Sequence, residues 1–153
     1  MVLEKEIVYS PGGKMPKRIL LVDDESDVSF ALERILDGNG FTVHSYQSPI
    51  LALQKFKADL YDLVILDIKM PEINGFDLYR QIKRLDKKAK VCFLTAGEMY
   101  YGVYSDIFSS LPANYFMRKP IDNQGLMKWI SDIIFDDTTI LIRNKWHDGG
   151  LIK

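Results

Sequence analysis

Residues that could carry out phosphoryl transfer follow short apolar runs in four separate parts of this sequence. Asp23 and Asp24 follow the first run, Asp67 follows the second, Thr95 ends the third, and Lys119 follows the fourth. Three carboxylates, one hydroxyl and one ammonium are the groups that a Mg²⁺-assisted transfer of a phosphoryl group to a carboxylate needs. A divalent cation reduces the repulsion between an anionic acceptor and an anionic phosphoryl group, which otherwise slows such a reaction.

Each of these residues has an ordinary structural explanation when it is considered alone. Asp23 and Asp24 could cap a helix, and Asp67 could form a turn. Thr95 suits a strand, and Lys119 could be a solvated surface lysine. The joint pattern favours a site, because turns do not require Asp, Thr and Lys at the ends of four separate strands.

Strand-like and helix-like segments alternate along most of the chain and predict a parallel sheet. The apolar runs at 19–22, 63–66 and 91–94 are continuous rather than alternating, which is typical of strands that are covered on both faces. The more polar segment 42–46 is expected at a sheet edge, and 114–117 is expected to be the fifth strand. Five successive strand–helix units predict an α/β fold with right-handed crossovers and a site at the carboxyl ends of the strands.

Apolar residues recur with helical spacing in the segments between the strands. The first helix is expected to have Ser26 as a cap and to end at Gly38 and Gly40, and the second to begin at Ser48-Pro49. The third is expected from Asn74 to about Leu85, the fourth from about Glu98 to Ser110, and the fifth after Asp122. The core-facing residues expected are Val28, Ala31, Leu32, Ile35 and Leu36, then Leu53 and Phe56, then Leu78, Ile82 and Leu85, then Val103, Ile107 and Leu111, and finally Leu126, Ile130, Ile133 and Ile134.

The composition fits one compact domain. The chain has 153 residues, 47% hydrophobic content and a formal charge of −1, which argues against a strong sequence-independent grip on nucleic acid. The N-terminus lacks the apolar core of a signal peptide, and no apolar run approaches the roughly 20 residues that span a bilayer. We therefore expect a cytoplasmic protein without membrane insertion. The single cysteine, Cys92, excludes a disulfide framework and is expected to be buried.

Both ends of the chain are expected to lie outside the domain. Residues 1–16 are predicted to be a tail, 17–137 the domain, and 138–153 an extension that is too short for a helix-turn-helix output domain. Met15 falls just before the first strand, so a native start at this position is a hypothesis.

Four segments of the sequence together resemble the receiver domain of two-component response regulators, of the stand-alone type found among chemotaxis regulators. They are Ile19 to Glu25, Asp67 to Gly75, Leu94 to Ala96 and Met117 to Pro120, in the family's order and approximate spacing. The resemblance covers about Lys17 to Asp136. It implies a doubly wound, flavodoxin-like sheet in strand order 2-1-3-4-5 with five helices, a Mg²⁺ cofactor, and a histidine kinase or phosphotransfer protein as partner.

The resemblance also implies a role for each site residue. Asp67 would be the phosphoryl acceptor. Mg²⁺ would be held by Asp24, Asp67, the backbone carbonyl of Lys69 and, through a water, Asp23. Thr95 and Lys119 would contact the phosphoryl group, Thr95 and Phe116 would form a conformational switch, Ala96 would leave the acceptor accessible, and Pro120 would follow a cis bond. Lys69, two residues after the acceptor, stands where the family tunes its dephosphorylation rate.

We therefore expect a phosphoprotein that accepts a phosphoryl group, switches conformation, signals through protein contacts and loses the group to water. It would act on itself rather than as a conventional turnover enzyme. Its downstream target would bind the face formed by the fourth helix, fifth strand and fifth helix. An aromatic patch there could be the binding surface, formed by Tyr100, Tyr101, Tyr104, Tyr115 and Trp129.

Three alternative functions remain open. A degenerate receiver would fold alike, would never be phosphorylated and would act as a protein interaction module. A haloacid-dehalogenase-type phosphatase is disfavoured because Lys69 stands where that class needs a second Asp. A flavodoxin-like cofactor binder is disfavoured because Asp23, Asp24 and Glu25 would repel a phosphate in the absence of metal.

Overall fold

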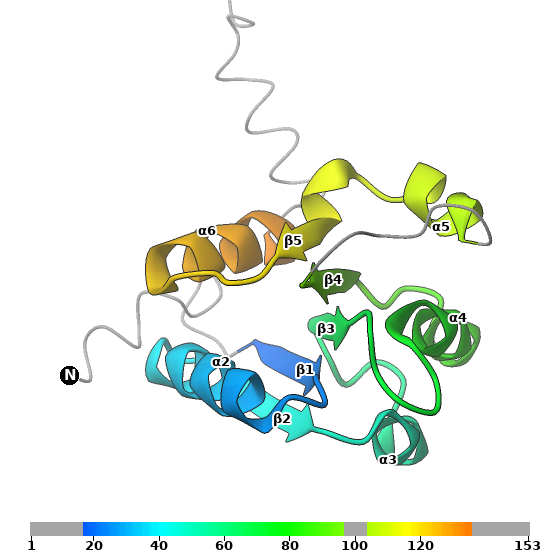
Figure 1. Ribbon diagram of the computed structural model, residues 1–153, viewed down its shortest axis with the longest axis horizontal. Coiled ribbons are helices and arrows are strands. Elements are labelled where there is room, and N and C mark those ends of the chain that lie inside the picture. Colours follow the sequence, from blue (N-terminus) through cyan, green and yellow to red (C-terminus); the bar gives the residue numbers. More distant parts are fainter. Residues whose placement is uncertain (1–16, 97–103, 136–153) are drawn as a thin grey trace, which may run out of the picture. The chain divides into compact units, whose positions relative to one another are not determined.

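The computed structural model describes residues 17–96 and 104–135 and shows a single parallel sheet with helices on both faces (Figure 1). The chain divides into two compact units, Met1–Ile121, which contains the whole sheet, and Asp122–Lys153, which contains the last helix. The elements are β1 (Arg18–Val22), α2 (Ser26–Gly38), β2 (Thr42–Tyr46), α3 (Pro49–Lys55), β3 (Leu63–Asp67), α4 (Gly75–Leu85), β4 (Val91–Thr95), α5 (Ser105–Ser110), a 3₁₀ turn (Ala113–Tyr115), β5 (Phe116–Arg118) and α6 (Asn123–Ile134).

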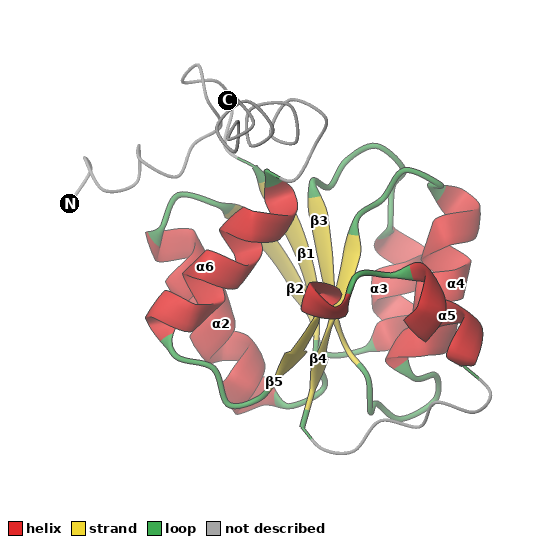
Figure 2. Ribbon diagram, turned by 90° about the horizontal axis from the view of Figure 1, so that it is seen from above, coloured by secondary structure: helices red, strands yellow, loops and turns green. Residues whose placement is uncertain are grey.

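The strand order is β2-β1-β3-β4-β5 and every pair is parallel, which confirms the predicted fold class. The polar strand β2 lies at one edge, as expected, and the three-residue β5 lies at the other. Helix α2 covers one face of the sheet, and α3, α4 and α5 lie on the opposite face (Figure 2). Among the described residues, no helix is long and apolar enough to cross a bilayer.

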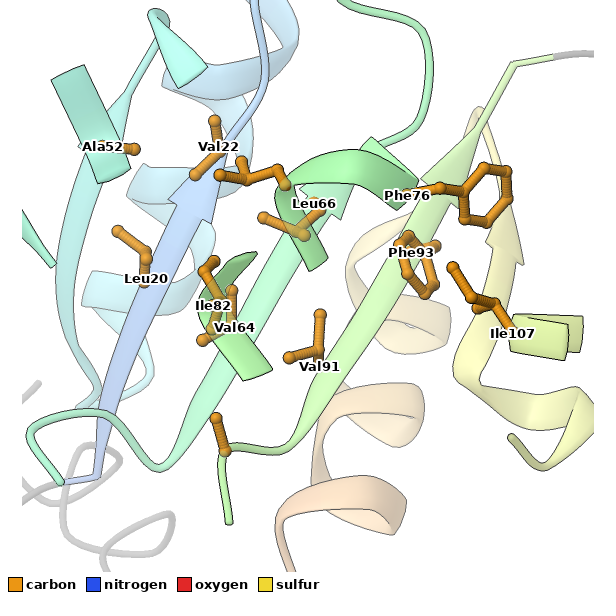
Figure 3. Packing of buried hydrophobic residues seen from close by; sticks show 12 residues of the cluster. Leu20, Val22, Ala52, Val64, Leu66, Phe76, Ile82, Val91, Phe93 and Ile107 are labelled. Carbon is orange, nitrogen blue, oxygen red and sulfur yellow. The ribbon is translucent and has the colours of Figure 1, made fainter. Parts of the chain in front are cut away.

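The continuous apolar runs give each central strand two buried faces. Leu20 and Val22 of β1 point to the face that carries α3 and α4, and strand alternation directs Ile19 and Leu21 to the α2 face. The cluster on the first of these faces is drawn in Figure 3 and consists of Leu20, Val22, Ala52, Val64, Leu66, Phe76, Leu78, Ile82, Ala89, Val91, Phe93 and Ile107. Cys92 is fully buried, as predicted, and burial raises the pKa of its thiol.

The start of α2 differs from the prediction by one residue. Ser26 is the first helical residue and Glu25 is the N-cap, without a side-chain capping bond. The reason is that Asp23 Oδ1 accepts a hydrogen bond from the Glu25 backbone N–H at 2.9 Å and closes the preceding turn. The end of the helix follows the prediction, because α2 ends at Gly38 and Gly40 has a φ of 93°.

Helix caps elsewhere follow the sequence closely. Ser48 Oγ accepts from Leu51 N at 3.1 Å with Pro49 as the first helical residue, and Asp122 Oδ1 accepts from Gly125 N at 2.6 Å. Asn74, predicted as the start of the third helix, is instead the N-cap of α4 and accepts from Asp77 N at 2.9 Å. In α6, the predicted apolar stripe of Leu126, Ile130, Ile133 and Ile134 is buried.

Two predictions about core-facing residues were wrong. Ala31 is exposed, and Leu85 is 54% exposed at the last position of α4. The chain turns sharply after Leu85, and Lys83 Nζ holds that turn by donating to the carbonyls of Lys87 and Ala89 at 2.7 Å and 2.9 Å. Ala89, which follows this turn, is 6% exposed and belongs to the core cluster.

The chain before β5 also differs from the prediction. Asn114 and Tyr115 belong to the 3₁₀ turn, so the strand begins at Phe116. Of the aromatic residues considered for a binding patch, Tyr115 and Trp129 are buried and Tyr104 is half-buried. Tyr100 and Tyr101, the start of the predicted fourth helix, the tail and the extension lie outside the described residues.

The contrast between two leucines of α4 gives a test of this packing. Leu78→Ala should lower the free energy of unfolding by about 2–5 kcal/mol, the usual cost of a cavity in a packed core, because Leu78 is fully buried. Leu85→Ala is the matched control and should cost less than about 0.5 kcal/mol, as an exposed substitution does. Urea unfolding of both variants measures the difference, and equal losses would contradict the exposed position of Leu85.

Candidate functional site

The sheet brings the predicted polar residues together at the carboxyl ends of its strands. Asp67 is the last residue of β3 and Thr95 the last of β4, while Asp23 follows β1 and Lys119 follows β5. Since the strands are parallel neighbours, their carboxyl ends lie together. Backbone bonds fix the arrangement, because Ile68 N donates to Leu94 O at 3.1 Å and Lys119 N donates to Thr95 O at 2.7 Å.

The ammonium of Lys119 lies among three carboxylates. Its Nζ atom is 2.8 Å from Glu25 Oε1, 2.9 Å from Asp23 Oδ2 and 3.4 Å from Asp67 Oδ1. The side chain of Asp23 is completely buried and that of Asp67 is 4% exposed. Charges so far from water require partners, so this ammonium compensates two carboxylates that would otherwise be expensive to bury.

Burial and crowding change the proton affinity of the acceptor. Burial raises the pKa of Asp67 to about 7, and the nearby carboxylates of Asp23 and Asp24 act in the same direction, while the charge of Lys119 opposes them. Burial by itself would lower the pKa of Lys119, but its contacts with Glu25, Asp23 and Asp67 outweigh this effect and hold the pKa above its usual value. Lys119 therefore stays charged at neutral pH.

The oxygen atoms of this cluster fit a hard divalent cation. One carboxylate oxygen each from Asp23, Glu25 and Asp67 can be chosen so that all lie within 4.8 Å of one another. Within the described part of the chain, Asp23 Oδ2 has no hydrogen-bond partner, so its short contact with Lys119 is an ion pair without hydrogen-bond geometry. Three carboxylates share one ammonium, and the excess negative charge and all-oxygen donor set suit Mg²⁺.

The group of three carboxylates shares Asp23 and Asp67 with the predicted ligand set. Asp24, predicted as a direct ligand, is half-buried and is not a member, whereas Glu25 is. Sequence reasoning quoted Glu25 as part of the acidic motif but gave it no role. Its position beside two aspartates could have indicated a role in the site. The ion pair with Lys119, 94 residues away, could not be predicted from the sequence.

The remaining predicted residues surround this cluster. Thr95 is 6% exposed, Lys69 and Ala96 are exposed, and the Lys119–Pro120 bond is cis, as expected. Phe116 is half-buried, and its ring stacks on Phe93 at 5.2 Å and on Phe108 at 5.0 Å between centroids. It therefore belongs to an aromatic column that runs between β4, β5 and α5.

Gly75 fixes the loop that follows the acceptor. Its backbone N–H donates to Ile68 O at 2.8 Å, and a Cβ at this position would overlap the carbonyl oxygen of Asp67 and touch Ile68 Cα at 3.0 Å. The start of α4 is thus pressed against the backbone of the acceptor residue. Only glycine allows this close approach without moving one of the two segments.

Comparisons with known proteins agree with this fold. Residues 19–131 match the response regulator receiver domain, and the chain belongs to this family of two-component signalling proteins. It is 36% identical over 120 residues to the chemotaxis protein CheY of Bacillus subtilis. The matched region covers 76% of this chain and 97% of CheY. The chain spans only 59% and 36% of the lengths of two other curated relatives that it matches.

Solved structures of receiver domains are similar as well. The non-phosphorylated receiver domain of HemR from Leptospira biflexa superposes with a TM-score of 0.70 at 26% identity, over 79% of this chain and 96% of that domain. The response regulator TrrA from Thermotoga maritima, solved in complex with Mg²⁺ and BeF, gives a TM-score of 0.62 at 32% identity, over 76% of this chain and 98% of TrrA.

The contact at Gly75 predicts a large effect of a single methyl group. Gly75→Ala should lower the free energy of unfolding by about 1–3 kcal/mol, as overpacking usually does, and should weaken Mg²⁺ binding because it displaces Asp67. Gly38→Ala is the matched control, since a Cβ there meets nothing within 4 Å. It should be neutral or stabilising by up to about 1 kcal/mol. Urea unfolding and Mg²⁺ titration measure both effects, and a harmless Gly75→Ala would contradict the close approach.

The raised pKa of Asp67 predicts a pH-dependent stability in the absence of divalent cations. The folded state binds the Asp67 proton more tightly than the unfolded state, because the pKa of Asp67 is about 7 in the fold and 3.8 for an unperturbed aspartate. The resulting stabilisation is complete below the lower value and is lost as the pH rises through the upper one. At about pH 8, Asp67→Asn should therefore exceed the wild type in free energy of unfolding by on the order of 2 kcal/mol.

Asp27→Asn is the control for this measurement, because Asp27 is an exposed carboxylate of α2. The pH dependence of its free energy of unfolding should match that of the wild type between about pH 5 and pH 8, because the substitution leaves Asp67 unchanged. Urea unfolding in the presence of a chelator gives both curves. If the difference in free energy of unfolding between Asp67→Asn and the wild type stays constant over this range, ionisation of the buried Asp67 carboxyl does not destabilise the fold.

Proposed function

We propose that this receiver accepts a phosphoryl group on Asp67 from a histidine kinase or phosphotransfer protein, signals in that form, and then loses the group to water. The observation that carries the proposal is the buried Asp67 carboxylate, 3.4 Å from Lys119 Nζ and grouped with two further carboxylates. This set joins an acceptor, a cation that can pair with a phosphoryl oxygen, and oxygen donors for a metal. The TrrA relative, solved with Mg²⁺ and BeF, supports the same reading.

In the proposed reaction, one Asp67 oxygen forms a bond to phosphorus while the bond between phosphorus and the histidine nitrogen of the donor breaks. The departing imidazole then takes up a proton. Mg²⁺, held by Asp23, Asp67 and the other predicted ligands, Asp24 and the Lys69 carbonyl, would neutralise charge on the transferring group. Lys119 would pair with one phosphoryl oxygen, and the Thr95 hydroxyl would donate to another. Ala96 is small and exposed, and its side chain would not block the approach of a donor to Asp67.

A groove beside the acidic cluster offers room for a donor protein. It has a volume of about 520 Å³ and is lined by Asp27 and apolar residues of α2, together with Glu25, Leu94, Ala96, Lys119, Pro120 and Ile121. A kinase or phosphotransfer protein that bound here would lie next to Asp67. Such a partner acts in the cytoplasm, which is the proposed location of this protein.

The proposed signal passes through Thr95 and Phe116. Thr95 O accepts from Lys119 N at 2.7 Å, so a shift of Thr95 towards a phosphoryl group would move the chain that leads back to β5. Phe116 stacks on rings of β4 and α5, and a change at β5 would therefore repack this column. A protein target that prefers one packing of α5 and β5 would read the modification.

A degenerate receiver that works through protein contacts alone is the second candidate. One observation favours it: Lys119 Nζ lies closer to Glu25 and Asp23 than to Asp67. An acceptor with a raised pKa is also a weaker nucleophile near neutral pH until a cation lowers that pKa. The two candidates differ in whether Asp67 can be modified.

Incubation with Mg²⁺ and acetyl phosphate tests the proposal. The wild type should gain one phosphoryl group by intact-protein mass spectrometry, and a chelator or Asp67→Asn should abolish the gain. Lys119→Met should lower the modified fraction at least about tenfold, because the ammonium neutralises charge on the transferred group. Asp27→Asn should behave as the wild type. Modification that persists in Asp67→Asn would exclude this acceptor, and a folded wild type that binds Mg²⁺ without modification would favour the degenerate receiver.

A further inference from the structure

The carboxylate of Glu25 makes the shortest of the three contacts with Lys119, although no role follows for it from the proposed reaction. Lys119 Nζ donates to Glu25 Oε1 at 2.8 Å, whereas the distance to the acceptor oxygen of Asp67 is 3.4 Å. The Glu25 side chain is also not used to start the helix, because it makes no capping hydrogen bond at the N-cap position of α2. Its one described partner is the ammonium of the site.

We propose that Glu25 is a positioning residue that draws the Lys119 ammonium away from Asp67 in the resting protein and gives it up when a phosphoryl group arrives. This inference rests on the proposed function. In the resting state Lys119 is divided among three carboxylates. Once Asp67 carries a phosphoryl group, its oxygens are the stronger acceptors, and the ammonium moves to them.

The different burial of the three carboxylates decides which partner Lys119 can leave. The side chain of Asp23 is completely buried and that of Asp67 is 4% exposed, so neither can exchange an ammonium for water. The side chain of Glu25 is 56% exposed, and its carboxylate can be hydrated as soon as the ion pair opens. Glu25 is therefore the one of the three partners that can release Lys119 at little cost.

Glu25 can act on the site in two ways, as a competitor for the Lys119 ammonium or as a ligand of the cation. A carboxylate that competes for Lys119 weakens the pairing between Lys119 and any anion bound at Asp67. Removing its charge should therefore strengthen anion binding, while the loss of an ordinary structural contact should weaken it. Glu25 also belongs to the oxygen group that suits a cation. If it were a metal ligand, its removal would weaken Mg²⁺ binding, which separates the two roles.

The test is a calorimetric titration of the full chain with beryllofluoride, a phosphoryl mimic, at saturating Mg²⁺. Glu25→Gln should bind beryllofluoride about two- to fivefold more tightly than the wild type, the range for a half-exposed ion pair. Asp27→Asn is the charge-matched control: Asp27 is an exposed carboxylate in the first turn of the same helix and, among the described ion pairs, forms none with Lys119. It should change the binding constant by much less. A second titration with Mg²⁺ alone should give similar constants for the wild type and Glu25→Gln.

Each other outcome is decisive. Unchanged or weaker beryllofluoride binding by Glu25→Gln overturns the inference and leaves the proposed function standing. An equal gain in Asp27→Asn overturns it as well, because the cause would then be the general charge of the helix end. A loss of Mg²⁺ affinity of about tenfold or more in Glu25→Gln would make Glu25 a metal ligand instead. A wild type that binds no beryllofluoride removes the proposed function and the inference together.

Discussion

The site depends on one ammonium that is shared by carboxylates from separate parts of the chain. Asp23 follows strand β1 and Asp67 ends strand β3, so both lie at the carboxyl ends of neighbouring strands. Both side chains are almost completely buried there. Their charges would repel each other in a medium that screens poorly, so Lys119 is as much a structural requirement as a chemical one. It reaches them because β5 is the second strand from β3 in a parallel sheet, so the carboxyl ends of these strands lie on the same side of the sheet.

Two links connect this charged cluster to the rest of the unit. The first is the loop from Asp67 to Gly75, where the start of α4 lies directly against the backbone of the acceptor. The second is the aromatic column of Phe93, Phe116 and Phe108, which begins at β4 and ends on α5. Phe76 stands beside Gly75 and packs on Phe93 at 5.1 Å, so the two links meet in the core. A closely packed core of this kind moves between discrete arrangements rather than deforming gradually.

The sequence was most informative where one short-range rule decided the outcome. The continuous apolar runs predicted the buried strands, and the resemblance predicted their order, while Ser48 and Asp122 capped helices as their residue types indicated. It failed where distant segments decide. The contact between Glu25 and Lys119, for example, joins two residues that lie 94 positions apart in the sequence. The polar residues of the site were predicted as a set, but the ion pair between Lys119 and Glu25 was not.

The two edges of the sheet also affect how the chain behaves in a crowded cell. The three-residue β5 offers few backbone groups to a neighbouring chain, and β2 alternates polar side chains along its length. His44 of β2 is further engaged by the Tyr61 hydroxyl at 2.7 Å. Long, flat, apolar edges recruit strands from other molecules and lead to aggregation, and neither edge here is of that type. Within the described residues, both edges of the sheet therefore offer little for pairing with a strand of another molecule.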